Sequence, residues 1–307
     1  MNYQEILEDI YKSIKPELKR GKVADYIPAL ARVKKEQFAM SITLLDGTNY
    51  SVGDVDKKFS IQSISKVFTF TKALNIYSKE LYKRVGVEPS GNPFNSLVQL
   101  EYENGIPRNP FINAGALVVT DSLISYYKDE YRALEKILTF VRDISNNSSI
   151  DFDEEVAKSE LEYGDRNLAL AYLMKSFGNF ENSVEKSVST YFKQCAITMS
   201  AKELSRAGLY LANGGVDPIT KKEFATLSQT KRINAVMLTC GHYDASGEFA
   251  YHVGLPAKSG VGGGILAIIP NVMSIAVWAP SLNRYGNSHA GTLALEEFTT
   301  KTGLSIF

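Results

Sequence analysis

The stretch Ser60-Ile61-Gln62-Ser63-Ile64-Ser65-Lys66, followed by the apolar run Val67-Phe68-Thr69-Phe70, constrains both the fold and the function of the chain. Ser63 and Lys66 are three residues apart, so on a helix they share one face. A lysine that burial keeps neutral can take the proton of a serine hydroxyl and make it a nucleophile. The ordinary alternative is a helix start with Ser60 as N-cap.

The composition predicts a globular protein and argues against several other classes. The chain has 307 residues, 44% of them hydrophobic, and its 34 Lys and Arg balance 34 Asp and Glu. Zero net charge without a basic run argues against a nucleic-acid partner, and no apolar run is long enough for a signal peptide or a membrane span. Two cysteines and three unclustered histidines predict no disulfide framework and no metal site. We therefore expect a cytoplasmic protein.

The predicted elements fall into three groups along the chain. Helical spacing predicts a first helix over 3–18, which Pro16 ends or kinks. Strands are expected at 38–45 and 48–52, around the turn Asp46-Gly47. The pattern is then almost entirely helical to about residue 213, apart from a loop at 145–149, and it includes a capping box at Ser200–Glu203. A helix over 229–238, strands over 248–253, 265–269 and 273–279, and a helix over 293–301 follow.

This order predicts an α+β fold of two lobes. Strands joined by short turns pair antiparallel, so we expect one antiparallel sheet, flanked by helices and built from both chain ends. The sheet lobe would comprise residues 1–60 and 214–307, and residues 61–213 would form an inserted all-helical lobe. The Ser63 helix would start at the seam between the lobes, where active sites commonly lie.

A second candidate motif, Lys258-Ser259-Gly260, lies in a glycine-rich segment between predicted strands. The backbone N–H of Val261 could form half of an oxyanion hole, and the N–H of Ser63 could form the other half. The positive charge of Lys258 could also lower the pKa of a neighbouring lysine or tyrosine. A glycine-rich turn with an exposed lysine is the ordinary alternative.

The two motifs follow one another as in the Ser-x-x-Lys acyl enzymes, in which Ser-x-x-Lys precedes Lys-Thr-Gly. The intermediate Ser-Asp-Asn motif is absent, which argues against a β-lactamase or a penicillin-binding protein proper. Tyr191 stands between the two motifs, in the helical block, and is a candidate middle partner.

The chain also resembles the serine-dependent glutaminases in collinear blocks from about residue 21 to about residue 290. The matching blocks are Gly21–Pro28, Gln62-Ser63 with Lys66, Glu88–Gly91, Asn113–Ala116, Gly164–Asn167, Leu211–Gly215, Cys240-Gly241 with Tyr243-Asp244, and His252–Val261. The resemblance implies a fold of the β-lactamase and transpeptidase type and the hydrolysis of L-glutamine to L-glutamate and ammonia.

The resemblance also implies roles for individual residues. Ser63 would be the nucleophile that forms a glutamyl ester, and Lys66 its base. The substrate would be surrounded by Tyr26, Ser63, Asn113, Glu160, Asn167, Tyr191, Tyr243 and the backbone at Val261. A zwitterionic substrate needs a carboxylate for its ammonium group and neutral donors for its carboxylate, and Glu160 and the two asparagines suit these needs. Either Tyr191 or Tyr243 would relay a proton.

Two other functions compete with this expectation. One is a different serine acyl enzyme on the same fold, such as a peptidase or an esterase. The other is a silent domain that holds an amino acid without turning it over, although such a domain would not need Ser63, Lys66 and Lys258 together. The resemblance implies no cofactor and no metal, and a homo-oligomer, most simply a homotetramer.

Overall fold

Strands from the two ends of the chain lie side by side in one sheet. In the computed structural model, which describes residues 1–307, five strands follow the order β2-β1-β7-β6-β5, and every neighbouring pair is antiparallel. Their bounds are β1 (Ala39–Leu44), β2 (Asn49–Gly53), β5 (Ala257–Ser259), β6 (Gly264–Ile269) and β7 (Met273–Trp278). Because β1 pairs with β7, the predicted sheet built from both chain ends is confirmed.

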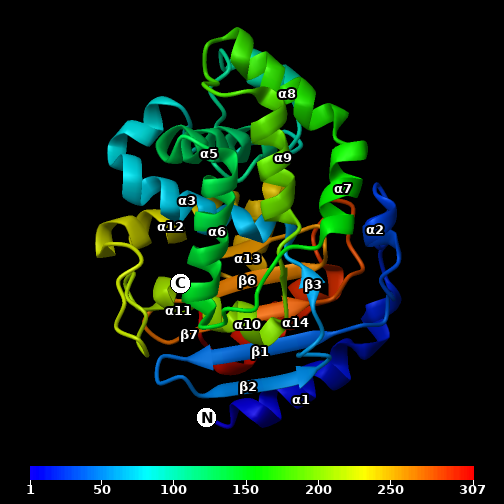
Figure 1. Ribbon diagram of the computed structural model, residues 1–307. Helices are drawn as coiled ribbons and strands as arrows, with labels where there is room; N and C mark the ends of the chain where they lie inside the picture. Colours follow the sequence, from blue (N-terminus) through cyan, green and yellow to red (C-terminus); the bar gives the residue numbers. More distant parts are fainter.

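Fourteen helices surround this sheet, mostly gathered on one side of it (Figure 1). They are α1 (Tyr3–Ile14), α2 (Pro28–Ala31), α3 (Ser65–Tyr77), α4 (Leu97–Tyr102), α5 (Asn113–Tyr127), α6 (Glu130–Ser145), α7 (Glu154–Glu162), α8 (Asp165–Ser176), α9 (Val184–Cys195), α10 (Ala201–Ala207), α11 (Leu209–Ala212), α12 (Leu227–Cys240), α13 (Ser246–His252) and α14 (His289–Thr302). None of them is long and apolar enough to cross a membrane.

The two faces of the sheet belong to different hydrophobic cores. Successive side chains of a strand point to opposite faces, so Ile265 and Ala267 pack with residues of α1 and α14. Leu266 and Ile268 point the other way, into the larger cluster of 54 buried residues that contains α3, α5, α6 and α9. The period-two alternation along β6 therefore joins the sheet to helices on both sides.

Several local signals act as the sequence predicts. Gly47 takes a φ of +90° in the turn between β1 and β2, a conformation that glycine adopts without steric cost. Both hydrogen bonds of the capping box at Ser200 and Glu203 are present at the start of α10. Pro16 lies just after α1, in a 3₁₀ turn over Lys15–Lys19.

The predicted strand over 248–253 is wrong, because residues 248–252 belong to α13 and Val253 is the C-cap of that helix. The strand was predicted because this stretch is rich in β-branched and apolar residues. Phe249 and Val253 are buried, however, while Tyr251 is 85% exposed. The two buried residues are four positions apart, which is the spacing of residues that share one face of a helix.

The helical block is interrupted close to Ser63. Ser60 belongs to the short strand β3 (Phe59–Ser60), which pairs with β4 (Thr198–Met199). Its hydroxyl donates to the Cys195 carbonyl at 2.9 Å, so the alternative of Ser60 as a helix N-cap is wrong. Non-local strand pairing decided this point, and local helix signals cannot show such pairing.

Candidate active site

Ser63 lies in a tight turn where β3 meets α3. The turn is a 3₁₀ turn over Gln62–Ile64, and α3 begins at Ser65. Gln62, which precedes the candidate nucleophile, has a φ of +48°, a strained conformation for a residue other than glycine. The turn directs Ser63 into a cavity while the backbone remains packed against β5, β6 and α9.

Lys66 is buried one helical turn after Ser63 and has no carboxylate partner. Its Nζ donates to the Phe111 carbonyl at 3.1 Å and to Asn113 Oδ1 at 2.8 Å. No hydrogen bond joins this Nζ to the Ser63 hydroxyl. Burial lowers the pKa of Lys66 from 10.5 to about 8. A substantial neutral fraction near neutral pH makes this amine suitable as a general base.

Lys258 is the second buried amine, and it lies in β5 with no exposed surface. Its Nζ donates to the Gly241 carbonyl at 3.0 Å and to the Ser259 carbonyl at 2.6 Å. The same Nζ lies 4.2 Å from the centroid of the Tyr243 ring. Burial, together with the charge of Lys66, holds the pKa of Lys258 well below its ordinary value. The alternative of an exposed lysine in a turn is therefore wrong.

The two candidate tyrosines differ in the partners of their hydroxyls. Tyr191 donates to Asn113 Oδ1 at 3.3 Å. The Tyr243 hydroxyl is buried without a hydrogen bond of good geometry, and the hydroxyls of Ser63 and Ser259 are its near neighbours. Burial raises the pKa of both tyrosines above the ordinary value. Of the two, only Tyr243 has a hydroxyl that is free to bond with Ser63 or a substrate.

A buried carboxylate lies at another part of the same cavity. Glu160, in α7, is 6% exposed, and its Oε1 accepts a hydrogen bond from the Tyr26 hydroxyl at 2.7 Å. No lysine or arginine forms an ion pair with it. Burial raises the pKa of Glu160, while hydrogen bonds from Tyr26 and Gln62 act against this rise. An unpaired carboxylate in such a place is suited to a positively charged ligand group.

Two amide side chains connect the carboxylate region to Lys66. Asn113, the first residue of α5, donates from Nδ2 to Asn167 Oδ1 at 3.0 Å. Its Oδ1 accepts from Lys66, and its backbone N–H donates to the Phe94 carbonyl at 3.0 Å. Asn113 therefore orients a lysine, an amide and a loop at once.

These side chains surround one cavity of about 320 Å³, a size suited to an amino acid. Both lysines lie behind its wall. The predicted residues that line it are Tyr26, Ser63, Asn113, Glu160, Asn167, Tyr191, Tyr243 and Val261. The structure thus brings together candidates that span more than 230 positions of the chain.

The backbone beside Ser63 offers two free donors. Neither the Ser63 N–H nor the Val261 N–H donates to another protein group. A Cβ added at Gly260 would lie 2.5 Å from the Ile61 carbonyl oxygen, and one at Gly262 would lie 2.4 Å from the Ser60 carbonyl oxygen. Glycine at both positions therefore allows the Val261 segment to approach the Ser63 turn closely.

Replacing Gly260 with alanine should displace Val261 from the Ser63 turn. We expect Gly260→Ala to lower the kcat of the reaction at this site about 10- to 100-fold, because a displaced donor loses much of its transition-state hydrogen bond. KM should change little. Steady-state kinetics would test this, with Gly247→Ala as control, since a Cβ at Gly247 meets nothing within 4 Å. Unchanged kcat in Gly260→Ala would contradict the role of this segment.

Several cavity residues were not among the predicted site residues. They are Gln62, Phe94, Asn95, Tyr163, Arg166, Phe192 and Cys195. The Arg166 guanidinium donates from Nε to the Asn95 carbonyl at 3.0 Å, and the Phe94 ring packs on Tyr243 with centroids 4.6 Å apart. Gln62 and Arg166 lie inside sequence blocks that carry the family resemblance, so those blocks could have indicated them.

Comparisons with known proteins agree with this geometry. A family model described as Glutaminase matches residues 21–307. The chain belongs to the glutaminase family. It is 62% identical over 307 residues to a glutaminase of Aliarcobacter butzleri, with all of both chains covered. It is 55% identical over 304 residues to a glutaminase of Agrobacterium fabrum, covering 99% of this chain and 98% of the relative.

Solved structures of the glutaminase family have the same fold. The structure of the probable glutaminase YbaS has a TM-score of 0.94 and 36% identity, covering 99% of this chain and 97% of that one. A Bacillus glutaminase crystallised in 4.3 M NaCl has a TM-score of 0.92 and 35% identity over the whole of both chains. The expected fold of the β-lactamase type is therefore confirmed. No group of three His, Cys, Asp or Glu side chains is placed to hold a metal ion.

Proposed function

We propose that the chain hydrolyses L-glutamine to L-glutamate and ammonia. The observation that carries this proposal is a serine next to a buried lysine of lowered pKa, in a cavity that also holds an unpaired carboxylate. Membership of the glutaminase family supports it, and so does the name of the relatives. One related solved structure, 33% identical, is of Mglu in its tris and glutamate form.

In this proposal the cavity recognises both charged groups of a free amino acid. Glu160 binds the α-ammonium group, because it is the buried carboxylate without a cationic partner. Asn113, Asn167 and the Tyr26 hydroxyl bind the α-carboxylate. The side-chain amide then reaches Ser63 and the free N–H groups of Ser63 and Val261.

The proposed chemistry is a double displacement. Neutral Lys66 accepts the Ser63 proton, and Ser63 Oγ attacks the amide carbon. The resulting oxyanion is held by the two free N–H groups. The C–N bond breaks as the proton passes to the leaving nitrogen, which departs as ammonia and leaves a glutamyl ester on Ser63. Water then cleaves the ester by the reverse proton path and releases glutamate.

Tyr243 is the better candidate for the proton relay. Its hydroxyl has no hydrogen-bond partner and lies near Ser63, whereas the Tyr191 hydroxyl is bonded to Asn113. Lys66 forms no direct hydrogen bond to Ser63, so a group between them would complete the path. In this proposal Lys258, whose Nζ lies 4.2 Å from the centroid of the Tyr243 ring, holds that ring in place for the transfer.

A coupled ammonia assay with L-glutamine, L-asparagine and D-glutamine tests the proposed activity. We expect turnover of L-glutamine well above that of the other two, because the carboxylate and amide contacts fix chain length and handedness. Ammonia release from none of the three would overturn the proposal and favour a silent binding domain.

Removing the negative charge of Glu160 should weaken substrate binding. We expect Glu160→Gln to raise KM for L-glutamine at least about tenfold, since a charge-assisted hydrogen bond contributes about 1.5–3 kcal/mol. Steady-state kinetics would separate KM from kcat. Glu162→Gln, an exposed change in the same helix, is the control. An unaltered KM in Glu160→Gln would assign the ammonium group to another partner.

We further propose a cytoplasmic homotetramer that needs no cofactor. Two lobes, comprising residues 1–60 with 214–307 and residues 61–213, would pack as one body. One hydrophobic cluster that holds residues of both parts supports their packing as one body. Sedimentation of the purified protein would test the oligomeric state.

A further inference from the structure

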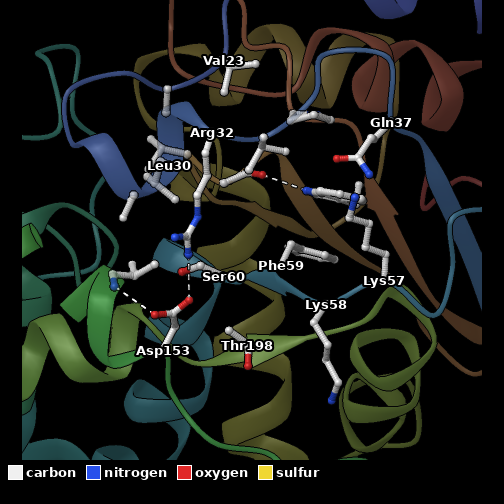
Figure 2. Close-up of a pocket in the computed structure, with 18 of the residues that line it drawn as sticks. Val23, Leu30, Arg32, Gln37, Lys57, Lys58, Phe59, Ser60, Asp153 and Thr198 are labelled. Atoms are coloured by element: carbon white, nitrogen blue, oxygen red, sulfur yellow. Dashed lines mark hydrogen bonds and ion pairs between the residues drawn. The ribbon is translucent and has the colours of Figure 1, made fainter. Parts of the chain in front are cut away.

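A second cavity, of about 590 Å³, lies beside the one that contains Ser63. Its lining residues come from the segment 23–37, which includes α2, from the strands β3 and β7, and from the start of α7, where Asp153 lies across from Gln37 (Figure 2). Its volume is within the range of small-molecule sites. None of the residues assigned to glutamine lines it except Val261.

The inner wall of this second cavity is apolar. Leu30, Phe59, Val156 and Trp278 are all at most 6% exposed and line it together with Val33. The Trp278 ring stacks on Phe59 with centroids 5.0 Å apart, which makes this wall rigid. A wall of this kind favours a ligand with an apolar body.

The rim of the second cavity carries a surplus of positive charge. Arg32 and Lys58 are paired with acidic residues, Arg32 with Asp153 and Glu155 and Lys58 with Glu203. Lys34 and Lys57 also line the cavity, and the side-chain ammonium group of neither forms an ion pair or a hydrogen bond. Two unpaired ammonium groups at one opening favour an anionic group on the ligand.

Gln37 adds a polar group that points to a ligand. The residue is 7% exposed and lines the cavity, yet its side-chain amide has no hydrogen-bond partner in the protein. Its amide atoms keep contact with solvent in the cavity, where a polar atom of a ligand can take the place of that solvent. In Figure 2 Gln37 and Lys57 lie on one side of the cavity, opposite Arg32 and Asp153. The amide is thus placed to bond a group held near the unpaired ammonium.

We propose that this cavity is a second binding site, for an organic anion with an apolar body. The apolar body packs on Phe59, Leu30 and Val33, and the anionic group lies between Lys34 and Lys57. The Gln37 amide bonds to a polar atom of the ligand.

Binding at this site would act on the active site through a shared piece of backbone. Ser60, Val261 and Gly262 line the second cavity, and a Cβ at Gly262 would clash with the Ser60 carbonyl. A ligand against this contact restrains the Val261 N–H relative to Ser63. The expected effect is on kcat more than on KM, and this part rests on the proposed function.

A fluorescence titration with 8-anilinonaphthalene-1-sulfonate tests the binding site on the full chain. We expect one saturable site per chain that saturating L-glutamine does not displace. N-phenyl-1-naphthylamine has the same apolar body without the sulfonate and should bind more weakly. The double variant Lys34→Gln/Lys57→Gln should weaken sulfonate binding about tenfold and leave the neutral probe unchanged, since each surface charge pair is worth up to about 1 kcal/mol.

Two further variants control this titration. Lys79→Gln/Lys301→Gln removes two exposed lysines without ion-pair partners far outside the cavity lining, so it should not alter binding. Val33→Trp fills the cavity and should abolish binding of both probes. Equal affinity for the sulfonate probe in wild type and in the Lys34/Lys57 variant would overturn the proposal of a second binding site. Displacement of the bound probe by L-glutamine would also overturn it.

A kinetic measurement tests the connection to Ser63. Saturating sulfonate should change the kcat for L-glutamine at least about twofold in wild type, and should not do so in the Val33→Trp variant. Saturable binding with an unchanged kcat would overturn the proposed coupling between the second cavity and Ser63, but it would not contradict the second binding site. The binding titration does not depend on turnover. A chain that hydrolyses no glutamine would therefore contradict the proposed function, and the titration would still test the second binding site.

Discussion

Replacing Ser63 with alanine is expected to abolish ammonia release from L-glutamine. Loss of a covalent nucleophile removes the ester route, so kcat should fall at least about 10⁴-fold. The fold should persist, because the change deletes only one hydroxyl that forms no hydrogen bond to a main-chain group in the structure. Circular dichroism and thermal unfolding would establish that the variant is folded before its activity is measured.

Ser65→Ala is the matched control, since Ser65 is the first residue of α3, two positions after Ser63, and does not line the cavity. It should retain activity within about threefold of wild type, as a substitution away from the reacting atoms does. Mass spectrometry of rapidly quenched wild type should detect one added glutamyl group, and Ser63→Ala should carry none. Near-normal turnover in Ser63→Ala would exclude the ester mechanism.

Replacing Lys66 with methionine is expected to lower activity and raise stability together. Without the amine nothing accepts the Ser63 proton, and kcat should fall about 10²- to 10⁴-fold. The pKa of Lys66 falls from 10.5 to about 8 on folding, which corresponds to about 3 kcal/mol of destabilisation when the amine is charged. Replacing the amine relieves this destabilisation, but losing the hydrogen bonds to Phe111 and Asn113 offsets part of the gain in stability. A net gain of about 1–2 kcal/mol in the free energy of unfolding remains.

The pH dependence of both properties follows from the same lowered pKa. The base is active when deprotonated, so kcat/KM in wild type should rise about tenfold per pH unit up to about pH 8 and then level off. The unfolded chain binds the lysine proton more tightly than the folded chain does. The free energy of unfolding should therefore rise between about pH 8 and 10.5, and the stability advantage of Lys66→Met should shrink over that range.

Lys72→Met, a partly buried lysine of the same helix, is the control for Lys66→Met. It should leave the pH profile of kcat/KM unaltered, because the Lys72 amine lies over Tyr127 and Phe140, which do not line the cavity. The Lys66 amine, in contrast, is bonded to Asn113, which does line it. Denaturant unfolding and initial-rate measurements across pH would check both properties. If the kcat/KM profile of wild type is flat between pH 6 and 9, Lys66 is not the general base.

Much of the fold could be predicted because its signals are local. The turn Asp46-Gly47, the capping box at Ser200 and the β-branched, apolar run of β6 each depend on residues a few positions apart. The error at 248–253 came from a pattern that fits both a strand and a helix, and burial of Phe249 and Val253 decided for the helix. The local pattern of 248–253 could not show which of its side chains the rest of the protein would bury.

The serine–lysine pair was present in the sequence from the start, together with the blocks that identify the family. The sequence by itself indicated the reacting pair, because Ser63 and Lys66 are three residues apart, and the collinear blocks contain several of the residues that line the cavity. Tertiary structure alone decided their chemistry. Burial in the core, next to Phe111 and Asn113 at the start of α5, lowers the pKa of Lys66, and desolvation depends on neighbours that no local spacing can indicate.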